Sequence, residues 1–225
     1  MTWKVERWSG SAADFHARPV PSPAEPAIWV FDVDRPALVL GSTQPDSVVD
    51  TVACAAAGID VVRRRSGGGA VFLEPGDAAW IDVIVPSGHP LADPDVGRAT
   101  WWLGEAWAAA LTSLGVADAR VHRGAMVSSQ WSSLVCFAGL GPGEVTVGGA
   151  KAVGISQRRT REAARFQTAA ALAWHPERLV PLLSPPLPTG HAVRALSGVV
   201  NPIGRPAVDV IDAVLGAVVA RSERS

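Results

Sequence analysis

Hydrophobic residues recur along the chain in short runs, most of them at the spacing of strands. Two such runs, 27–33 and 37–40, are separated by Asp-Arg-Pro, a pattern typical of two strands joined by a tight turn, so we expect a hairpin there. The other short apolar or alternating segments predict further strands at 59–62, 70–73, 80–85, 134–138, 144–147, 152–156 and 166–173. We therefore expect the middle of the chain to be mostly sheet.

Three segments have the spacing of helices. Asp46 and Ser47 can cap a helix over residues 48–57, which Gly58 can end in a left-handed conformation. Residues 98–114 place small and aromatic side chains on one helical face. From position 206 onward, Val, Ile and Leu repeat at the same spacing, which predicts a terminal helix.

The first 26 residues are expected to form an extended, proline-rich leader. Prolines at positions 19, 21, 23 and 26 fix backbone angles and remove hydrogen-bond donors, which disfavours both helix and central strand. No internal repeat and no long linker divides the remainder. The sequence therefore predicts one domain over residues 1–225.

Composition limits the class of protein and its partners. Of the 225 residues, 48% are hydrophobic and 18% are charged, which is typical of a globular domain. The formal net charge of -1 offers no basic surplus, so we expect neither nucleic acid nor a membrane surface as a partner. The chain has two cysteines and no segment typical of an export signal or a membrane span, which favours a cytoplasmic location.

A basic, glycine-rich segment lies between two predicted strands. Residues 63–71 have the sequence Arg-Arg-Arg-Ser-Gly-Gly-Gly-Ala-Val. Glycines let backbone N–H groups approach a ligand, and arginines add paired donors for a phosphate or carboxylate, so this segment predicts an anion-binding loop. It matches neither a Walker loop nor a dinucleotide fingerprint, because it leads into a strand. A flexible hairpin with basic flanks is the alternative.

Lys151 and Cys136 are the candidates for catalysis. Lys151 has glycines on both sides and a long side chain, so its ammonium could reach a buried phosphate, carbonyl or thiolate. Taken alone, such a lysine is more often a solvated surface charge, and a cysteine in an apolar run is more often an inert packing residue. Glu144 could orient Lys151, or it could be an ordinary exposed carboxylate.

Three segments carry a resemblance to a known family. Residues 63–72 resemble the signature loop of lipoate-protein ligases, which surrounds the acyl group and the adenylate phosphate. Residues 149–158, Gly-Ala-Lys-Ala-Val-Gly-Ile-Ser-Gln-Arg, resemble the family motif Gly-x-Lys-x-x-Gly-x-Ala-Gln with its active-site lysine. Cys136-Phe137, followed by Glu144 and Lys151, is similar to the octanoyltransferase branch, whose nucleophile is the cysteine of that segment. The chain thus resembles the biotin/lipoate protein ligase superfamily.

This resemblance implies a fold and a set of site residues. The fold is α/β (α+β), a mixed, mostly antiparallel sheet flanked by helices, as in class II synthetases and biotin/lipoate ligases, here without an accessory C-terminal domain. The catalytic residues are Lys151 and Cys136. The implied substrate-binding residues are Arg63, Arg64, Ser66, Gly67, Gly68, Gly69, Ala70, Val71, Gly154 and Ser156. We expect the amides of this loop and the ammonium of Lys151 to converge on one pocket. Some of the tryptophans could line a slot for the acyl chain, although core packing is the commoner role of tryptophan. The candidates are Trp80, Trp101, Trp102, Trp107 and Trp131.

The implied activity is protein lipoylation, the transfer of a lipoyl or octanoyl group to a lysine of a lipoyl carrier domain. Two mechanisms stay open. A ligase would use ATP and Mg to make an acyl-adenylate from lipoate or octanoate, whereas a transferase would need no cofactor and would carry the acyl group on Cys136, with Lys151 favouring the thiolate and stabilising the oxyanion. Expected partners are the E2 subunit of a 2-oxoacid dehydrogenase, the glycine cleavage H protein or acyl carrier protein.

Two family histidines have no counterpart in the matching positions. Leu73-Glu74 stands where relatives have His-Asp, and Gln167-Thr168 stands where they have His-Gly. These replacements leave a third hypothesis open, a non-catalytic acyl-binding protein or a subunit of a split lipoate ligase. The five histidines of the chain are scattered and have no metal-ligand spacing, so we expect no protein-bound metal centre.

Overall fold

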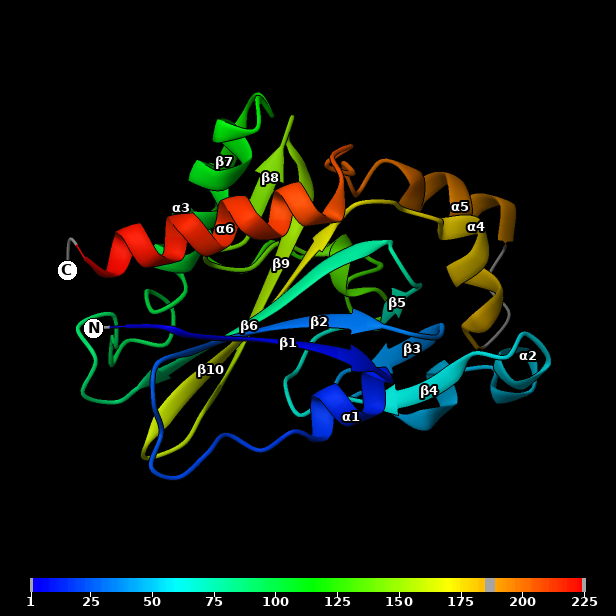
Figure 1. The fold of residues 1–225 in the computed structure, drawn as a ribbon. Helices are drawn as coiled ribbons and strands as arrows, with labels where there is room; N and C mark the ends of the chain where they lie inside the picture. Colours follow the sequence, from blue (N-terminus) through cyan, green and yellow to red (C-terminus); the bar gives the residue numbers. More distant parts are fainter. Residues whose placement is uncertain (1, 185–188, 224–225) are drawn as a thin grey trace.

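The computed structural model describes residues 2–184 and 189–223, and its largest element is a seven-stranded sheet (Figure 1). The first two strands are parallel and every other neighbouring pair is antiparallel, which confirms the predicted fold class. In sheet order, the strands are β1 (Lys4–Gly10), β2 (Ala27–Val33), β6 (Ala78–Pro86), β10 (Ala163–Ala171), β9 (Ala150–Arg159), β8 (Val145–Val147) and β7 (Ala119–Val121).

A second, three-stranded sheet lies against one face of the large sheet. Its order is β4 (Asp60–Arg63), β3 (Ala37–Leu40), β5 (Val71–Leu73). The predicted hairpin of β2 and β3 is therefore wrong, because the two strands belong to different sheets. The reason is burial: all four residues of β3 are buried, Ala37 and Val39 in one hydrophobic cluster and Leu38 and Leu40 in another, so this strand needs partners on both faces.

Two helices cover the opposite face of the large sheet, α3 (Trp101–Ser113) and α6 (Ala207–Ser222). They bury the main core, in which Leu103 and Trp107 of α3 meet Val210 and Val214 of α6 and apolar residues of the central strands. Both predicted helices are confirmed, and Gly115 ends α3 in a left-handed conformation. Figure 1 shows these helices crossing on the side away from the small sheet.

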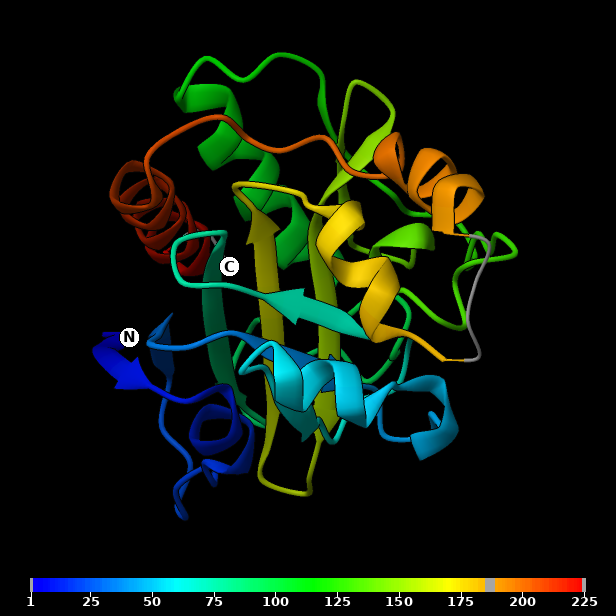
Figure 2. The same cartoon turned by 90° about the vertical axis from the view of Figure 1, so that its right-hand side faces the viewer.

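Shorter helices surround the small sheet, as Figure 2 shows from the side. Apolar residues from the loops and helices around β3 form a second core cluster, and aromatic residues from the N-terminal region form a third. The helices are α1 (Ala12–Ala17), α2 (Thr51–Ala56), α4 (Pro176–Leu179) and α5 (Thr189–Ser197), with 3-10 turns η1 (Asp46–Val48), η2 (Cys136–Ala138) and η3 (Val180–Leu182). No helix within 2–184 and 189–223 has the length and apolar character needed to cross a membrane.

The N-terminal leader departs most from prediction. It contains strand β1, which pairs with β2, and helix α1, which begins where the Ser11 side chain accepts a hydrogen bond from the Asp14 amide. The prolines start only at residue 19, so nothing in residues 4–17 breaks regular structure. The prediction of an extended leader is thus wrong for these residues.

Two other predicted boundaries also change. Helix α2 is capped by Asp50, which accepts from the Ala53 amide at 2.9 Å, instead of by Asp46 or Ser47. Segment 134–138 forms the turn η2 and a single bridge from Val135 to the glycine loop, not the predicted strand.

Candidate active site

Lys151 reaches the site because strand β9 contains a β-bulge. Val145 lies opposite Val153 and Thr146 lies opposite Lys151, so Ala152 is an extra residue in β9. Ala152 and Val153 both face the core under α3 and α6. Without the bulge, simple alternation would place Lys151 on that same face with Val153. The extra residue instead turns Lys151 toward the small sheet.

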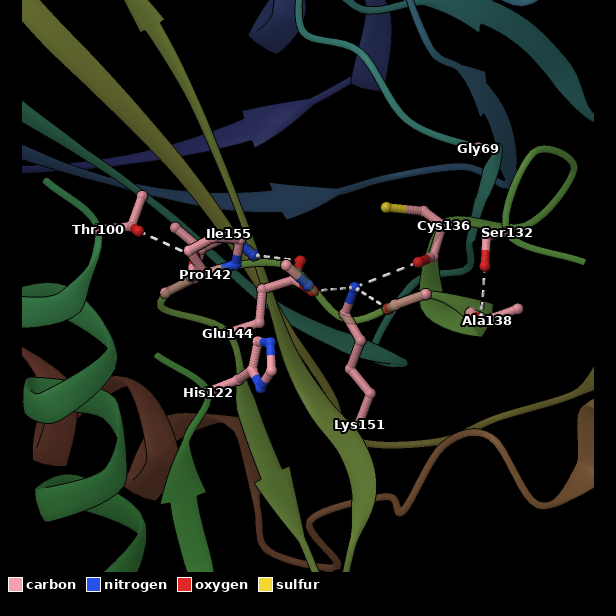
Figure 3. A network of polar contacts seen from close by, with 12 residues as sticks. Gly69, Thr100, His122, Ser132, Cys136, Ala138, Pro142, Glu144, Lys151 and Ile155 are labelled. Carbon is pink, nitrogen blue, oxygen red and sulfur yellow. Dashed lines mark hydrogen bonds and ion pairs between the residues drawn. The ribbon is translucent and has the colours of Figure 1, made fainter. Parts of the chain in front are cut away.

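The Lys151 ammonium is buried and has a full set of acceptors (Figure 3). The side chain is 4% exposed, and Nζ lies 2.7 Å from Oε2 of Glu144. The same nitrogen donates to the carbonyl oxygens of Cys136 at 3.1 Å and Gly139 at 3.0 Å. Because an ammonium has three N–H bonds, these three oxygens satisfy it. Lys151 therefore holds the backbone of the segment that carries Cys136.

Glu144 is itself held in a fixed orientation. Its Oε2 accepts from the Gly141 amide at 2.7 Å, and its Oε1 accepts from the Ile155 amide at 3.1 Å. The side chain is 7% exposed, so the charge has little contact with water and needs the opposite charge of Lys151. Of the two sequence interpretations for Glu144, orientation of Lys151 matches the geometry and exposure does not.

Cys136 sits on the glycine-rich loop through backbone contacts. Its amide donates to the Ala70 carbonyl at 2.9 Å, and the Ala70 amide donates to the Leu134 carbonyl at 2.7 Å. Gly69 lies so close that a Cβ there would come within 2.6 Å of the Val135 backbone. A glycine is required at position 69 because the two chain segments touch backbone to backbone.

Arg64 fills the inside of the glycine-rich loop. Its guanidinium donates to the carbonyls of Val39, Gly67 and Gly69 at 3.2, 2.8 and 2.7 Å. A Cβ placed on Gly68 would lie 3.0 Å from Arg64 Nη2 and 3.6 Å from Cys136 Sγ, so the cation and the sulfur flank the same point. Burial lowers the pKa of Arg64, and the charge of the Cys136 thiolate opposes that shift. Arg64 is therefore a cation beside the thiol.

Three backbone amides of the glycine-rich loop have no protein acceptor among the described residues, and two of them, those of Gly68 and Gly69, belong to residues that approach Cys136. Within the described part of the chain, the N–H groups of Gly67, Gly68 and Gly69 donate to no protein acceptor, whereas their carbonyls are partly used by Arg64. In Figure 3 one dashed contact of Lys151 ends on the Cys136 carbonyl oxygen, and the Cys136 sulfur points away from that oxygen. Free amides near a nucleophile are suited to binding an oxyanion.

A narrow, mostly apolar pocket of about 70 Å³ is bounded by Arg64, Cys136 and Glu144, together with apolar residues. It lies between the large and the small sheet. Its lining residues are His16, Val39, Arg64, Val71, Leu73, Trp80, Cys136, Phe137, Glu144, Gly154, Ile155, Ser156, Gln167, Thr168 and Ala169.

Five of the twelve sequence-predicted site residues line this pocket: Arg64, Val71, Cys136, Gly154 and Ser156. Lys151 and the three glycines of the loop are not among its lining residues. Ser66 lies at its edge, where its hydroxyl accepts from Ser156 at 3.1 Å. Arg63 lies outside, because its guanidinium donates to the Gly41 and Gln44 carbonyls and pairs with Asp46. Of the five tryptophans considered for the acyl slot, Trp80 alone is among the pocket residues in the described chain. Trp102 and Trp107 pack in the core, as expected for most of them.

A family model described as the lipoyl protein ligase A/B catalytic domain matches residues 14–203. The chain belongs to this family. Among its relatives is octanoyltransferase LipM from Clostridioides difficile (strain 630), 24% identical over 188 residues that cover 80% of this chain and 69% of that protein.

Solved structures of lipoate ligases have the same fold. A bipartite lipoate protein ligase from Thermoplasma acidophilum, described with its E2 lipoyl domain, aligns with a TM-score of 0.76 at 16% identity, over 98% of this chain and 84% of that one. A lipoate-protein ligase A bound with ATP aligns with a TM-score of 0.72 at 17% identity, over 98% and 85% of the two chains.

Several site residues of this lipoyl ligase family member were missed by sequence reasoning. His16 enters the pocket from α1, which was not predicted, and its Nδ1 lies 3.3 Å from the Gln167 amide nitrogen. Asp82 is fully buried and pairs with Arg165 at 2.6 Å. Isolated charges in apolar strands are the one signal that could have pointed to this pair, because a buried charge requires a partner.

Proposed function

We propose that this protein transfers an octanoyl or lipoyl group from a thioester donor to a lysine amine of a lipoyl carrier domain, with Cys136 as the covalent carrier. The observation on which this depends is the placement of the Cys136 sulfur. It faces an apolar pocket, beside Arg64 and the free amides of Gly68 and Gly69. Membership of the lipoyl ligase family and the likeness to an octanoyltransferase support the same activity.

The first half-reaction forms an enzyme thioester. The Cys136 thiolate attacks the donor carbonyl, a carbon–sulfur bond forms, and the donor carbon–sulfur bond breaks to release the donor thiol, which takes up the proton lost by Cys136. The oxyanion that forms in between accepts hydrogen bonds from the Gly68 and Gly69 amides. The Arg64 guanidinium and the Cys136 sulfur flank the same point of the loop, Gly68, so a positive charge lies near the reacting group.

The second half-reaction forms an amide. The neutral amine of the carrier lysine attacks the Cys136 thioester, the same amides hold the oxyanion, and the carbon–sulfur bond breaks to restore the thiolate. The amine loses its proton to solvent or to the departing sulfur. Lys151 acts by positioning: paired with Glu144, it fixes the carbonyls on either side of η2 and so the direction of the nucleophile.

An ATP-dependent ligase is supported less well by the same groups. The donors expected to hold an adenylate phosphate are already engaged: Lys151 by three oxygens, Arg64 by three carbonyls and the Ala70 amide by Leu134. Backbone amides remain, which suit one oxyanion better than a triphosphate with its metal ion. As they are arranged, these residues do not fit ATP.

Partners and location follow from the chemistry. The acyl acceptor is a lipoyl domain, such as that of a 2-oxoacid dehydrogenase E2 subunit or a glycine cleavage H protein, and the donor is an acyl carrier thioester. Both cysteines are free, as a thiol-dependent enzyme of the reducing cytoplasm requires. A non-catalytic acyl-binding role would give no reason for a partly buried thiol beside free amides.

The chain provides its own control for testing this function. We expect an octanoyl thioester donor to add one octanoyl group to the wild-type protein, measured by intact mass. Cys136→Ala should abolish the adduct and transfer to a lipoyl domain, whereas Cys54→Ala should keep both, since Cys54 is buried in α2. ATP-dependent pyrophosphate release by Cys136→Ala, with transfer preserved, would overturn the proposal in favour of a ligase.

A further inference from the structure

The acyl pocket adjoins a second and larger cavity. This second cavity has a volume of about 440 Å³ and is lined by arginines at its outer side, among them Arg65, Arg158 and Arg161. Two residues line both spaces, His16 from α1 and Gln167 from β10. The side chains of His16 and Gln167 therefore form the wall between the acyl pocket and the arginine-lined cavity.

Strand register gives the direction from the nucleophile to this wall. On the pocket face of the large sheet, Gly154 pairs with Ala169, and a Cβ on Gly154 would lie 3.5 Å from Lys151 Cε, so this row marks the catalytic end. The next row pairs Ser156 with Gln167, and the row beyond pairs Arg158 with Arg165. Each row is two residues, roughly 7 Å, further along the strands. An acyl chain that extends from the catalytic end along the sheet thus meets Gln167 before it meets the arginines.

An ion pair on the sheet fixes the helix that carries His16. Arg165 pairs with Asp82 at 2.6 Å and donates to the backbone carbonyls of Phe15 at 2.8 Å and Arg18 at 2.7 Å. These carbonyls lie on either side of His16, at the end of α1. The helix end is therefore tied to the centre of the large sheet, which keeps the imidazole in place.

The imidazole is built into the wall by direct contacts. Its Nδ1 lies 3.3 Å from the Gln167 amide nitrogen, and its ring lies 4.7 Å from the Trp80 ring. The Gln167 amide also contacts Asp82 at 3.3 Å, so its NH₂ faces two acceptors. Burial, followed by the charges of Arg64 and Arg165, lowers the pKa of His16 to about 3, so the ring is neutral at pH 7. A neutral ring can face the methyl end of an acyl chain at little cost.

Leu73 and Gln167 both line the acyl pocket together with His16. The imidazole in this pocket comes from α1.

We propose that His16, together with Gln167, closes the far end of the acyl pocket and limits the length of the acyl chain that the enzyme transfers. This inference rests on the proposed acyl-transfer function. It assigns His16 a role in substrate specificity, without contact with the reacting atoms.

The test compares acyl chain lengths in wild type, His16→Ala and His16→Phe. Donor thioesters of octanoate, decanoate and dodecanoate are offered with a lipoyl domain, and kcat/KM is measured for each. Removing the imidazole should join the two cavities, so His16→Ala should raise the dodecanoyl-to-octanoyl ratio by about tenfold or more, as expected for several additional buried methylenes. His16→Phe refills the space and should restore the wild-type ratio.

Further measurements separate the possible failures. Gln167→Ala removes the other half of the wall without touching α1, so it gives the same readout if His16→Ala does not fold. An unchanged length ratio in both variants, with octanoyl transfer intact, would overturn the proposal. If the wild-type protein transfers no acyl group, the proposed function fails instead. Calorimetry with free octanoate and dodecanoate then measures the length limit directly, and equal discrimination by wild type and both variants would reject it.

Discussion

Two buried ion pairs hold the acyl pocket, one at each end. At the catalytic end, Lys151 and Glu144 are 4% and 7% exposed; at the far end, Arg165 and Asp82 are 7% and 0% exposed. Both pairs use their remaining donors to hold backbone carbonyls of another segment, η2 in the first case and the end of α1 in the second. The difference is what each segment presents to the pocket: Cys136, the proposed nucleophile, at one end and His16, part of the proposed wall, at the other.

This comparison teaches that burial of a charge is used here to position a short segment that has little core of its own. A buried pair gains little stability over a well-packed apolar pair of the same size, because desolvation offsets the attraction. Its geometry is nevertheless strict, since each donor needs an acceptor in a fixed direction. We expect removal of either pair to lower stability in a general way, but to change only the function of its own end of the pocket: transfer for Lys151–Glu144, and chain-length preference for Arg165–Asp82.

The largest effect is expected from Lys151→Met. It leaves the Glu144 carboxylate buried without its partner, so the free energy of unfolding should fall by about 4 kcal/mol, and acyl transfer should be lost. The double variant Lys151→Met/Glu144→Gln removes the uncompensated charge and should recover part of the stability without recovering transfer, since glutamine keeps only one of the two oxygens that accept from the Gly141 and Ile155 amides. Urea unfolding and a transfer assay check the two parts. Transfer by the stable double variant would contradict a positioning role for Lys151.

The next largest effect is expected from Arg165→Met. It leaves the buried Asp82 carboxylate without its partner and releases the end of α1, so the free energy of unfolding should fall by about 3 kcal/mol. Octanoyl transfer should continue, because the contacts around Cys136 remain, while the preference for octanoyl over dodecanoyl donors should decrease. If this variant lost transfer of all chain lengths at a temperature where it is folded, the two ends of the pocket would not be independent.

The backbone contact at the catalytic end can be tested with two neighbouring glycines. Gly69→Ala places a Cβ within 2.6 Å of the Val135 backbone and should cost about 2 kcal/mol, together with most of the transfer activity, because the Cys136 segment must shift. Gly67→Ala meets nothing within 4 Å and serves as the matched control. Thermal unfolding and kcat for both variants are the measurements. Equal effects of the two substitutions would argue against a close backbone contact between Gly69 and the segment that carries Cys136.

The smallest effect is a pH dependence of stability from His16. Its folded pKa of about 3 lies below its unfolded value, so the unfolded chain binds a proton first as the pH falls and stability is lost between about pH 6.5 and pH 3. Between pH 7 and 5.5 the loss from this group should be about 1 kcal/mol. In His16→Phe, the free energy of unfolding should fall less between pH 7 and 5.5, by that amount. Asp82, whose pKa burial raises, is present in both proteins and cancels in the difference.

Sequence reasoning located the elements with a clear local cause. Helices α3 and α6 follow from their apolar spacing, and the left-handed Gly58 and Gly115 end helices as expected. It missed α1, because the prolines that follow dominated the local composition. It also predicted a strand at 134–138, where an apolar run forms a 3-10 turn under the glycine loop. Local patterns cannot distinguish these outcomes when long-range contacts decide them.

The sequence by itself determined which residues are candidates for the chemistry: the glycine-rich loop, Cys136 and Lys151 are recognisable by type and spacing. Only the tertiary structure decided where they point. Arg63 and Arg64 are neighbours, so alternation sends them to opposite sides, but the fold alone selects Arg64 for the thiol. Likewise, one extra residue in β9 aims Lys151, and His16 meets Gln167 across 151 positions. The physical reason is that side-chain direction depends on register and on distant partners, which no local pattern contains.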